Sequence, residues 1–238
     1  MIVVDSQSRR LTDDHDHELP GGRPHVSESL AGVLADAASG RFPPADGGVT
    51  IMPQPSPRDA GVIGFTAHAV IFVDADPAWV ASQLPAGDLS GPLSPPFLHA
   101  LSQATSRPAG SIDMLCAAEP LTGPAPVDLS RERDPAHPRI ARALRYRDDV
   151  RAWRTRGGVV LLGRGVAGRW ETAIEVDQDQ RGRGLGRQLA TAARHLVPAG
   201  EPLWAQGPPA TLPASGLASQ PASRPSAPRS CSPPNQVR

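Results

Sequence analysis

Hydrophobic and polar residues change their spacing along the second half of the chain in a way that predicts strands. Residues 150–155 alternate polar and apolar side chains, residues 159–162 are all apolar, and residues 170–176 alternate again. Segments rich in glycine separate these three stretches. Alternation is typical of a half-buried strand, and short runs between turns favour hairpins. The pattern therefore predicts an antiparallel meander of three strands.

A helix is predicted directly after this meander. Apolar residues recur there at the spacing of one helical face, at Leu185, Leu189, Ala192 and Leu196. Pro198 and Gly200 are typical of the end of a helix. Residues 202–206 then predict a further strand, and residues 138–146 predict a helix before the meander.

The first half of the chain has helical and strand patterns of its own. Helices are predicted near residues 27–38, 77–84 and 97–104, and strands over residues 47–52, 61–73 and 112–117. These elements indicate a small α/β lobe over residues 26–118. A polar segment, residues 1–25, is expected to be flexible. Residues 119–136, which include several prolines, are expected to link the lobe to a second unit, residues 137–206.

The composition argues against several classes of protein. Acidic and basic residues balance to a formal net charge of zero, which gives no support to binding of nucleic acid or of a membrane surface. The two cysteines are far apart and suggest a reducing compartment, without a disulfide or a zinc site. The chain has no long apolar run and no signal-peptide pattern, so we expect a cytoplasmic protein. The oligomeric state does not follow from the sequence.

Several histidines and acidic residues have simple structural interpretations. Residues 13–18 alternate carboxylates with histidines, a pattern more typical of a solvated charge run than of a metal site. His68 and His99 lie in apolar segments and are interpreted as packed histidines. We therefore expect no bound metal.

The segment between the meander and its helix carries the candidate chemistry. Glycines at positions 182, 184 and 186 leave the backbone N–H groups uncovered, so that several of them can point at one anion. The helix that follows adds the positive end of its dipole. Arg181, Arg183 and Arg187 add full positive charges. The segment therefore predicts a site for a phosphate-bearing ligand.

The order of strand, Arg-x-x-Gly-x-Gly loop and helix resembles the acyl-CoA motif of the GNAT family of acetyl-CoA-dependent N-acetyltransferases. The resemblance covers residues 137–206. It implies an α/β fold with a mixed, mostly antiparallel sheet and flanking helices, and acetyl-CoA as co-substrate. It also implies that the CoA diphosphate is held by Arg181, Gly182, Arg183, Gly184, Leu185, Gly186 and Arg187. The backbone of Ile174 and Val176 would pair with the pantetheine arm, and the acceptor would be an amine on a small molecule or a peptide.

Two carboxylates are candidates for the general base of such a transfer. Glu171 and Glu175 fall on the same face of the strand that precedes the loop. Either could draw a proton from an ammonium group, directly or through water. The structural alternative is that they face solvent or pair with Arg151 or Arg154 on the neighbouring strand.

A second glycine motif lies earlier in the chain and suggests a different ligand. Residues 163–168 fit the G-x-G-x-x-G fingerprint of dinucleotide-binding proteins and follow a predicted strand. That fingerprint requires a helix directly after the glycines, within a parallel βαβ unit. The alternating residues 170–176 predict a strand instead. An NAD(P)-dependent oxidoreductase is therefore the weaker interpretation, and turn glycines the stronger one.

The sequence after Gln206 departs from the family pattern. Residues 207–238 are rich in proline and serine and contain no aromatic or acidic residue, so we expect a disordered tail. The family has a helix and closing strands at this place. Codons compatible with this tail also permit, in another reading frame, strings that resemble the missing segment. We therefore expect a frameshift near Gln206, which puts the activity of this particular chain in question. A non-catalytic acyl-CoA-binding or regulatory module is the first alternative.

Overall fold

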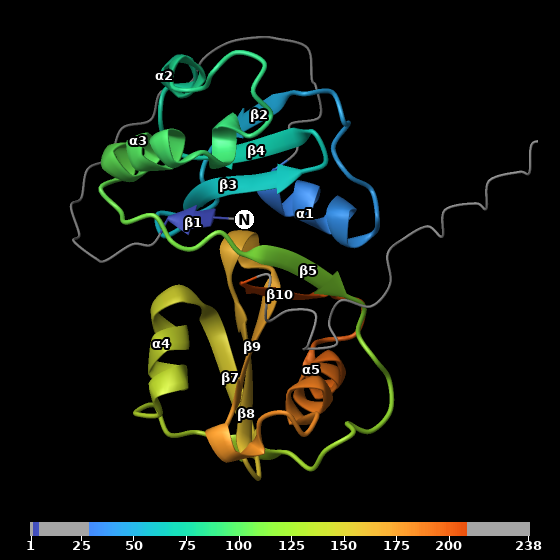
Figure 1. The fold of residues 1–238 in the computed structure, drawn as a ribbon. Helices are drawn as coiled ribbons and strands as arrows, with labels where there is room; N and C mark the ends of the chain where they lie inside the picture. Colours follow the sequence, from blue (N-terminus) through green and yellow to red (C-terminus); the bar gives the residue numbers. More distant parts are fainter. Residues whose placement is uncertain (1, 5–28, 209–238) are drawn as a thin grey trace, which may run out of the picture.

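Two β-sheets, one above the other in Figure 1, organise the chain. The structure is a computed structural model that describes residues 2–4 and 29–208. Helices flank both sheets, which confirms the expected α/β class with mixed sheets. Most of the expected flexible N-terminus and of the expected tail lies outside the described residues. Residues 2–4 are an exception, because they form a strand.

The upper sheet has four strands in the order β1-β3-β4-β2. Its strands are β1 (Ile2–Val4), β2 (Val49–Met52), β3 (Ala60–Phe65) and β4 (His68–Phe72). The segment 61–73, rich in Val, Ile and Phe, folds into an antiparallel β3–β4 hairpin. Strand β2 lies parallel to β4 at one edge of the sheet, and β1 pairs with β3 at the other edge.

Helices cover both faces of this upper sheet. Helix α1 (Leu30–Ala38) packs on one face through Leu30, Val33 and Leu34. Helices α2 (Pro77–Ser82) and α3 (Pro95–Thr105) pack on the other face, with a short 3-10 turn, η1 (Gly91–Leu93), before α3. Alternate residues of β3 and β4 point to the two helical layers, as strand geometry requires.

The lower sheet has six strands in the order β5-β10-β9-β8-β7-β6. Its strands are β5 (Met114–Ala118), β6 (Ser130–Glu132), β7 (Asp148–Thr155), β8 (Gly158–Arg164), β9 (Trp170–Val176) and β10 (Leu203–Gly207). Strands β7, β8 and β9 form the predicted antiparallel meander. Helix α4 (Pro138–Tyr146) precedes it and α5 (Leu185–Leu196) follows it, as the sequence indicated.

The two helices of the lower unit lie on opposite faces of the meander (Figure 1). Helix α4 packs through Ile140 and Ala143 against Leu161. Helix α5 packs through Leu189 and neighbouring alanines against Val160 on the other face. Alternate residues of β8 therefore belong to two separate hydrophobic clusters, one on each face of the sheet.

Strands β9 and β10 diverge after a short region of pairing. They are parallel and pair only at Trp170 with Leu203 and at Glu171 with Trp204. Strand β10 pairs along its full length with β5 on its other side. Residues 172–176 of β9 therefore have no described strand on the side toward β10. The strand expected at 112–117 thus belongs to the lower sheet, although it precedes the expected linker.

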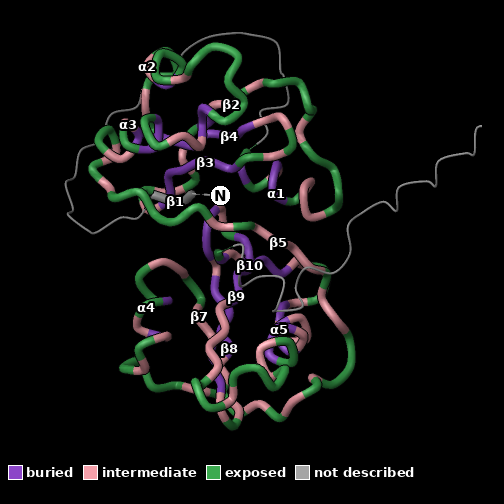
Figure 2. Tube along the Cα trace, viewed as in Figure 1, coloured by how far each residue is buried: buried purple, intermediate pink, exposed green. Residues whose placement is uncertain are grey.

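The lobes share a continuous apolar contact. Leu34 of α1 belongs to the same buried cluster as Trp204 of β10 and Val166, which lies in the 3-10 turn η2 (Val166–Gly168). Arg58 of the upper lobe pairs with Asp148 of β7 at 2.7 Å. Figure 2 shows buried stretches along strands of both sheets.

Candidate functional site

The glycine loop joins the end of β9 to α5. A 3-10 turn, η3 (Gln178–Gln180), follows β9, and Gly184 is the N-cap of α5. Gly182 has φ 75° and Gly184 has φ 86°, both in the left-handed region that favours glycine. Residues 181–184 are exposed. The conformation of the loop itself thus favours glycine at these two positions.

The amides of this loop are available to a ligand. The N–H groups of residues 182–186 donate no backbone hydrogen bond to any described residue, whereas those of Arg187 and Gln188 bond to the Gly184 carbonyl. A Cβ added at Gly182 or Gly184 would meet no atom within 4 Å. Free N–H groups at the start of a helix, next to open space, are suited to bind an anion.

The β7–β8 turn fixes the base of the loop. The Asp177 N–H donates to the Gly157 carbonyl at 2.9 Å. A Cβ added at Gly158 would lie 2.8 Å from Leu189 Cδ1 and 2.9 Å from the Glu175 carbonyl oxygen. The end of β9 and the first turns of α5 are therefore packed against one hairpin, which holds the loop between them.

The three predicted arginines have different surroundings. The Nε of Arg181 donates to the Val176 carbonyl at 3.2 Å, so this side chain turns back to the end of β9. Arg183 and Arg187 form no ion pair with any described residue. These two positive charges are therefore not neutralised within residues 2–4 and 29–208.

The open edge of β9 lies next to the same loop. Ile174 and Val176 are half-buried and pack with Leu185 in the α5 cluster. A Cβ added at Gly186 would lie 3.7 Å from Val176 Cγ2, so the helix begins directly beside the end of the strand. The structure thus brings together the predicted cofactor-binding residues of the strand and of the loop.

Glu171 is buried in an ion pair with two arginines. Its carboxylate lies 2.8 Å from Arg169 Nε and 3.0 Å from Arg147 Nε, and also accepts the Val166 N–H at 3.3 Å. Burial acts to raise the pKa of Glu171, but the charges of Arg169 and Arg147 outweigh it and lower the pKa overall. This geometry favours the structural alternative, with Arg147 and Arg169 as partners in place of Arg151 or Arg154.

Glu175 lies near the far end of the same strand and is more accessible. Its carboxylate accepts from Arg139 Nε of α4 at 2.8 Å, and 44% of its side chain is exposed. The hydrogen bond from Arg139 lowers the pKa of Glu175. Of the two candidate bases, Glu175 is therefore the one that water or an amine can reach.

We expect the substitution Arg139→Gln to raise the pKa of Glu175. The guanidinium is the main cause of the lowered pKa, and glutamine removes its charge. An NMR titration of the Glu175 carboxyl carbon in both proteins measures the change. Arg142→Gln, on the same helix but without an ion pair to Glu175, is the matched control. A pKa of Glu175 that is equal in wild type and Arg139→Gln would contradict the assignment.

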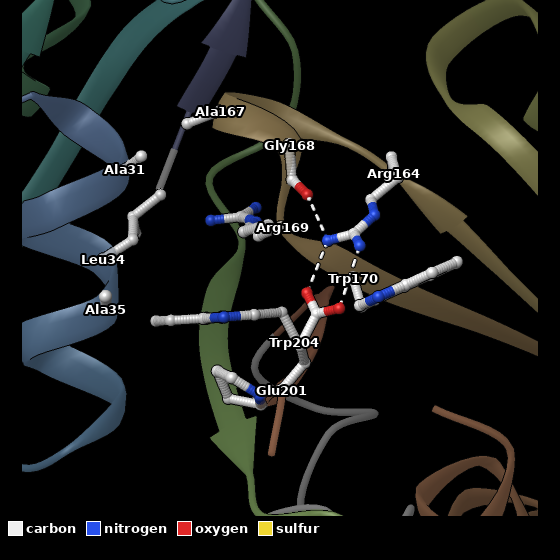
Figure 3. Close-up of a pocket in the computed structure, with 11 residues that line it drawn as sticks. Ala31, Leu34, Ala35, Arg164, Ala167, Gly168, Arg169, Trp170, Glu201 and Trp204 are labelled. Carbon is white, nitrogen blue, oxygen red and sulfur yellow. Dashed lines mark hydrogen bonds and ion pairs between the residues drawn. The ribbon is translucent and has the colours of Figure 1, made fainter. Parts of the chain in front are cut away.

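A cavity of about 150 Å³ lies between the lobes, near the opposite end of β9 from the loop (Figure 3). Residues of α1, including Leu34, form one wall, and Trp170 and Trp204 form another. Arg164 and Glu201 both line the cavity and form a bidentate ion pair with each other at 2.6 and 2.9 Å. The Glu201 carboxylate is thus held by an arginine, as that of Glu175 is, but it lies at the end of β9 away from the glycine loop.

The second glycine motif lies in a different kind of connection from the one it would need. Gly163 lies near the end of β8. Gly165 precedes the η2 turn and Gly168 is its last residue, and the turn leads directly into β9. Strands β8 and β9 are antiparallel. A dinucleotide fingerprint needs a helix and a parallel strand at this place. Gly165 instead makes room for a carboxylate, because a Cβ there would lie 2.2 Å from Glu171 Cδ.

Comparisons with known proteins assign the chain to no family. No protein-family model, no curated protein and no solved structure matches the chain. Among the described residues, no helix has the length and apolar character to cross a membrane. Within the same residues, no three His, Cys, Asp or Glu side chains gather as a group that could hold a metal ion.

Proposed function

We propose that the lower unit binds acetyl-CoA and transfers the acetyl group to an amine. One observation carries the proposal: a loop whose amides donate no backbone hydrogen bond, and whose Arg183 and Arg187 form no ion pair, among the described residues lies beside the open edge of β9. A ligand held at the loop through its diphosphate could extend a polar arm along that edge, where residues 172–176 have no described strand beside them on the side toward β10. The Arg-x-x-Gly-x-Gly motif and the order of the elements support the same assignment.

The residues of the site would have distinct roles. The amides of residues 182–186 would hold the diphosphate, with Arg183 and Arg187 adding charge. The backbone of Ile174 and Val176 would pair with the pantetheine arm. When bound, acetyl-CoA supplies the acetyl group as a thioester. Positioning of the amine against that thioester then accounts for much of the rate.

Glu175 is our choice for the base that takes the proton from the ammonium group. It is partly exposed on β9, whereas Glu171 is buried between Arg147 and Arg169. A base works best with a pKa near the operating pH, so Glu175 would act more strongly once its bond to Arg139 loosens. We therefore expect Arg139 to move when the acceptor binds.

A non-catalytic acyl-CoA-binding module is the second candidate function. It is favoured by one observation: both acidic residues of β9 are paired with arginines in the free protein. Such pairing keeps both carboxylates ionised but lowers their basicity. The same loop would then hold the CoA diphosphate without chemistry at the thioester.

Calorimetry followed by turnover assays tests the proposal. We expect the chain to bind acetyl-CoA and not NAD, and to release free CoA thiol with at least one member of an amine panel. Glu175→Gln is expected to lower that turnover by about 100-fold while leaving the Kd for acetyl-CoA unchanged, because general bases contribute rates of this order. Binding without turnover would favour the binding module. Binding of NAD in place of acetyl-CoA would overturn both.

A further inference from the structure

The upper lobe contains a hydrogen-bonded relay of carboxylate, imidazole and hydroxyl that acetyl transfer does not use. His68 Nδ1 lies 2.8 Å from Asp46 Oδ1, and His68 Nε2 lies 2.9 Å from Thr50 Oγ1. Only 7% of the His68 side chain is exposed. The parallel pairing of β2 with β4 sets Thr50 opposite Val70, so Thr50 lies on the same face as His68.

The carboxylate of Asp46 fixes the direction of its hydrogen bond with His68, and in a neutral ring this also sets the direction of the bond with Thr50. The hydrogen bonds from His68 and from the Gly48 N–H lower the pKa of Asp46, so its carboxylate is ionised and only accepts. His68 Nδ1 must therefore carry the hydrogen and donate it to Asp46. In the neutral ring, Nε2 is then an acceptor, and the Thr50 hydroxyl donates to it. This is the order of acid, base and nucleophile found in hydrolytic triads.

We propose that Thr50 is a nucleophile, activated by His68, that hydrolyses small hydrophobic esters. Thr50 Oγ1 forms a bond to the ester carbonyl carbon and passes its proton to His68 Nε2. The ester C–O bond breaks, and the leaving alcohol takes that proton. Water then attacks the acyl-threonine and gives a proton to His68, which returns one to Thr50 as the acid leaves. The sum is one ester and one water converted to one acid and one alcohol.

The backbone around Thr50 offers donors for the oxyanion. The Gly48 and Met52 carbonyls accept from Ala69 and Val73 of the β4 segment, so the even-numbered residues of β2 bond toward β4. The N–H groups of Val49 and Ile51 therefore point to the outer edge of the sheet, where no described strand lies. Amides at this edge are placed to stabilise a developing oxyanion next to Thr50.

An aromatic surface next to the relay indicates the class of substrate. Phe65 lies directly opposite His68 in the β3–β4 ladder, on the same face of the sheet. The Phe42 ring lies 6.3 Å from the Phe65 ring, and Phe42 is 62% exposed. Phe65 is half-buried beside His68, and the exposed Phe42 ring extends this apolar surface, which favours an aryl or short acyl ester over a charged one.

Hydrolysis of p-nitrophenyl acetate by the full chain tests the proposal. We expect Thr50→Val to lose about 100-fold or more of the enzyme-dependent rate, and Thr50→Ser to keep most of it. Thr105→Val is the matched control, because the Thr105 hydroxyl bonds only to helix carbonyls, chiefly that of Leu101. It should hydrolyse the ester at the wild-type rate.

Covalent labelling of the wild-type chain gives a second readout that does not depend on a variant. A fluorophosphonate probe should attach to Thr50, which mass spectrometry of the peptides can locate. The proposal is overturned if Thr50→Val is as active as wild type, or if the probe leaves Thr50 unmodified. Should circular dichroism show that Thr50→Val does not fold, the labelling result decides alone. Neither readout involves acetyl-CoA, so this test is independent of the proposed function of the lower unit.

Discussion

Replacement of Gly184 by aspartate is expected to lower the affinity for acetyl-CoA by about 100-fold or more, which corresponds to about 2.7 kcal/mol. A Cβ at this position would point into open space in front of the free amides, where we propose that the diphosphate lies. A carboxylate there would repel the ligand's negative charge, an effect of about 1 to 4 kcal/mol at 4 Å near a protein surface. Calorimetric titration with acetyl-CoA measures the loss.

Gly87→Asp is the matched control for this variant. Gly87 lies in the upper lobe, has φ 74° and, like Gly184, has no atom within 4 Å of an added Cβ. Both variants place aspartate in a left-handed conformation, at a cost to folding of about 1 to 2 kcal/mol. Gly87→Asp should nevertheless bind acetyl-CoA with wild-type affinity. If Gly184→Asp also binds like wild type, the glycine loop does not hold the diphosphate.

Local patterns predicted the elements around the loop correctly. Period-two alternation gave β7 and β9, the apolar run gave β8, and the i, i+4, i+7 spacing gave α5. These elements form from residues that are close in sequence, and each has one or two buried faces that the pattern displays. The position of the loop between β9 and α5 follows from them directly.

Contacts between distant segments could not be read in the same way. Strand β5 precedes the linker, yet it pairs with β10 and forms one edge of the lower sheet. An apolar strand shows that it will be buried but not which neighbour it will have. The short β9–β10 pairing, which opens the edge of β9, depends on this choice of partner.

The candidate side chains show the same division between local and distant information. Alternation placed Glu171 and Glu175 on one face of β9, and both do face the α4 side, where Arg147 and Arg139 meet them. Their partners come from α4, from the residue that follows it and from the turn before β9, and no strand register could indicate them. His68 is packed as expected, but its bonds to Asp46 and Thr50 arise from the parallel β2–β4 pairing. Parallel neighbours are joined by long connections, so their side-chain contacts have no sequence signature.

Glu171→Gln is expected to destabilise the fold by about 3 to 5 kcal/mol, the range for breaking a buried ion pair. Only 6% of the Glu171 side chain is exposed, and glutamine keeps its shape while removing the charge that Arg169 and Arg147 require. Urea denaturation at pH 7 measures the loss. Glu201→Gln is the matched control, because that carboxylate also binds an arginine but is 41% exposed, and it should cost less than about 1 kcal/mol.

The difference between wild type and Glu171→Gln should also depend on pH in one direction. The folded-state pKa of Glu171 is lowered, so its ionised form contributes stability that is fully present above the unfolded pKa of about 4.3. That contribution is lost as the pH falls through the lower, folded-state value. Denaturation curves at pH 7 and at progressively acidic pH should therefore converge for the two proteins only below about pH 4. A gap between the curves that stays constant down to acidic pH, or losses that are equal for Glu171→Gln and Glu201→Gln, would show that the carboxylate of Glu171 does not hold these arginines together.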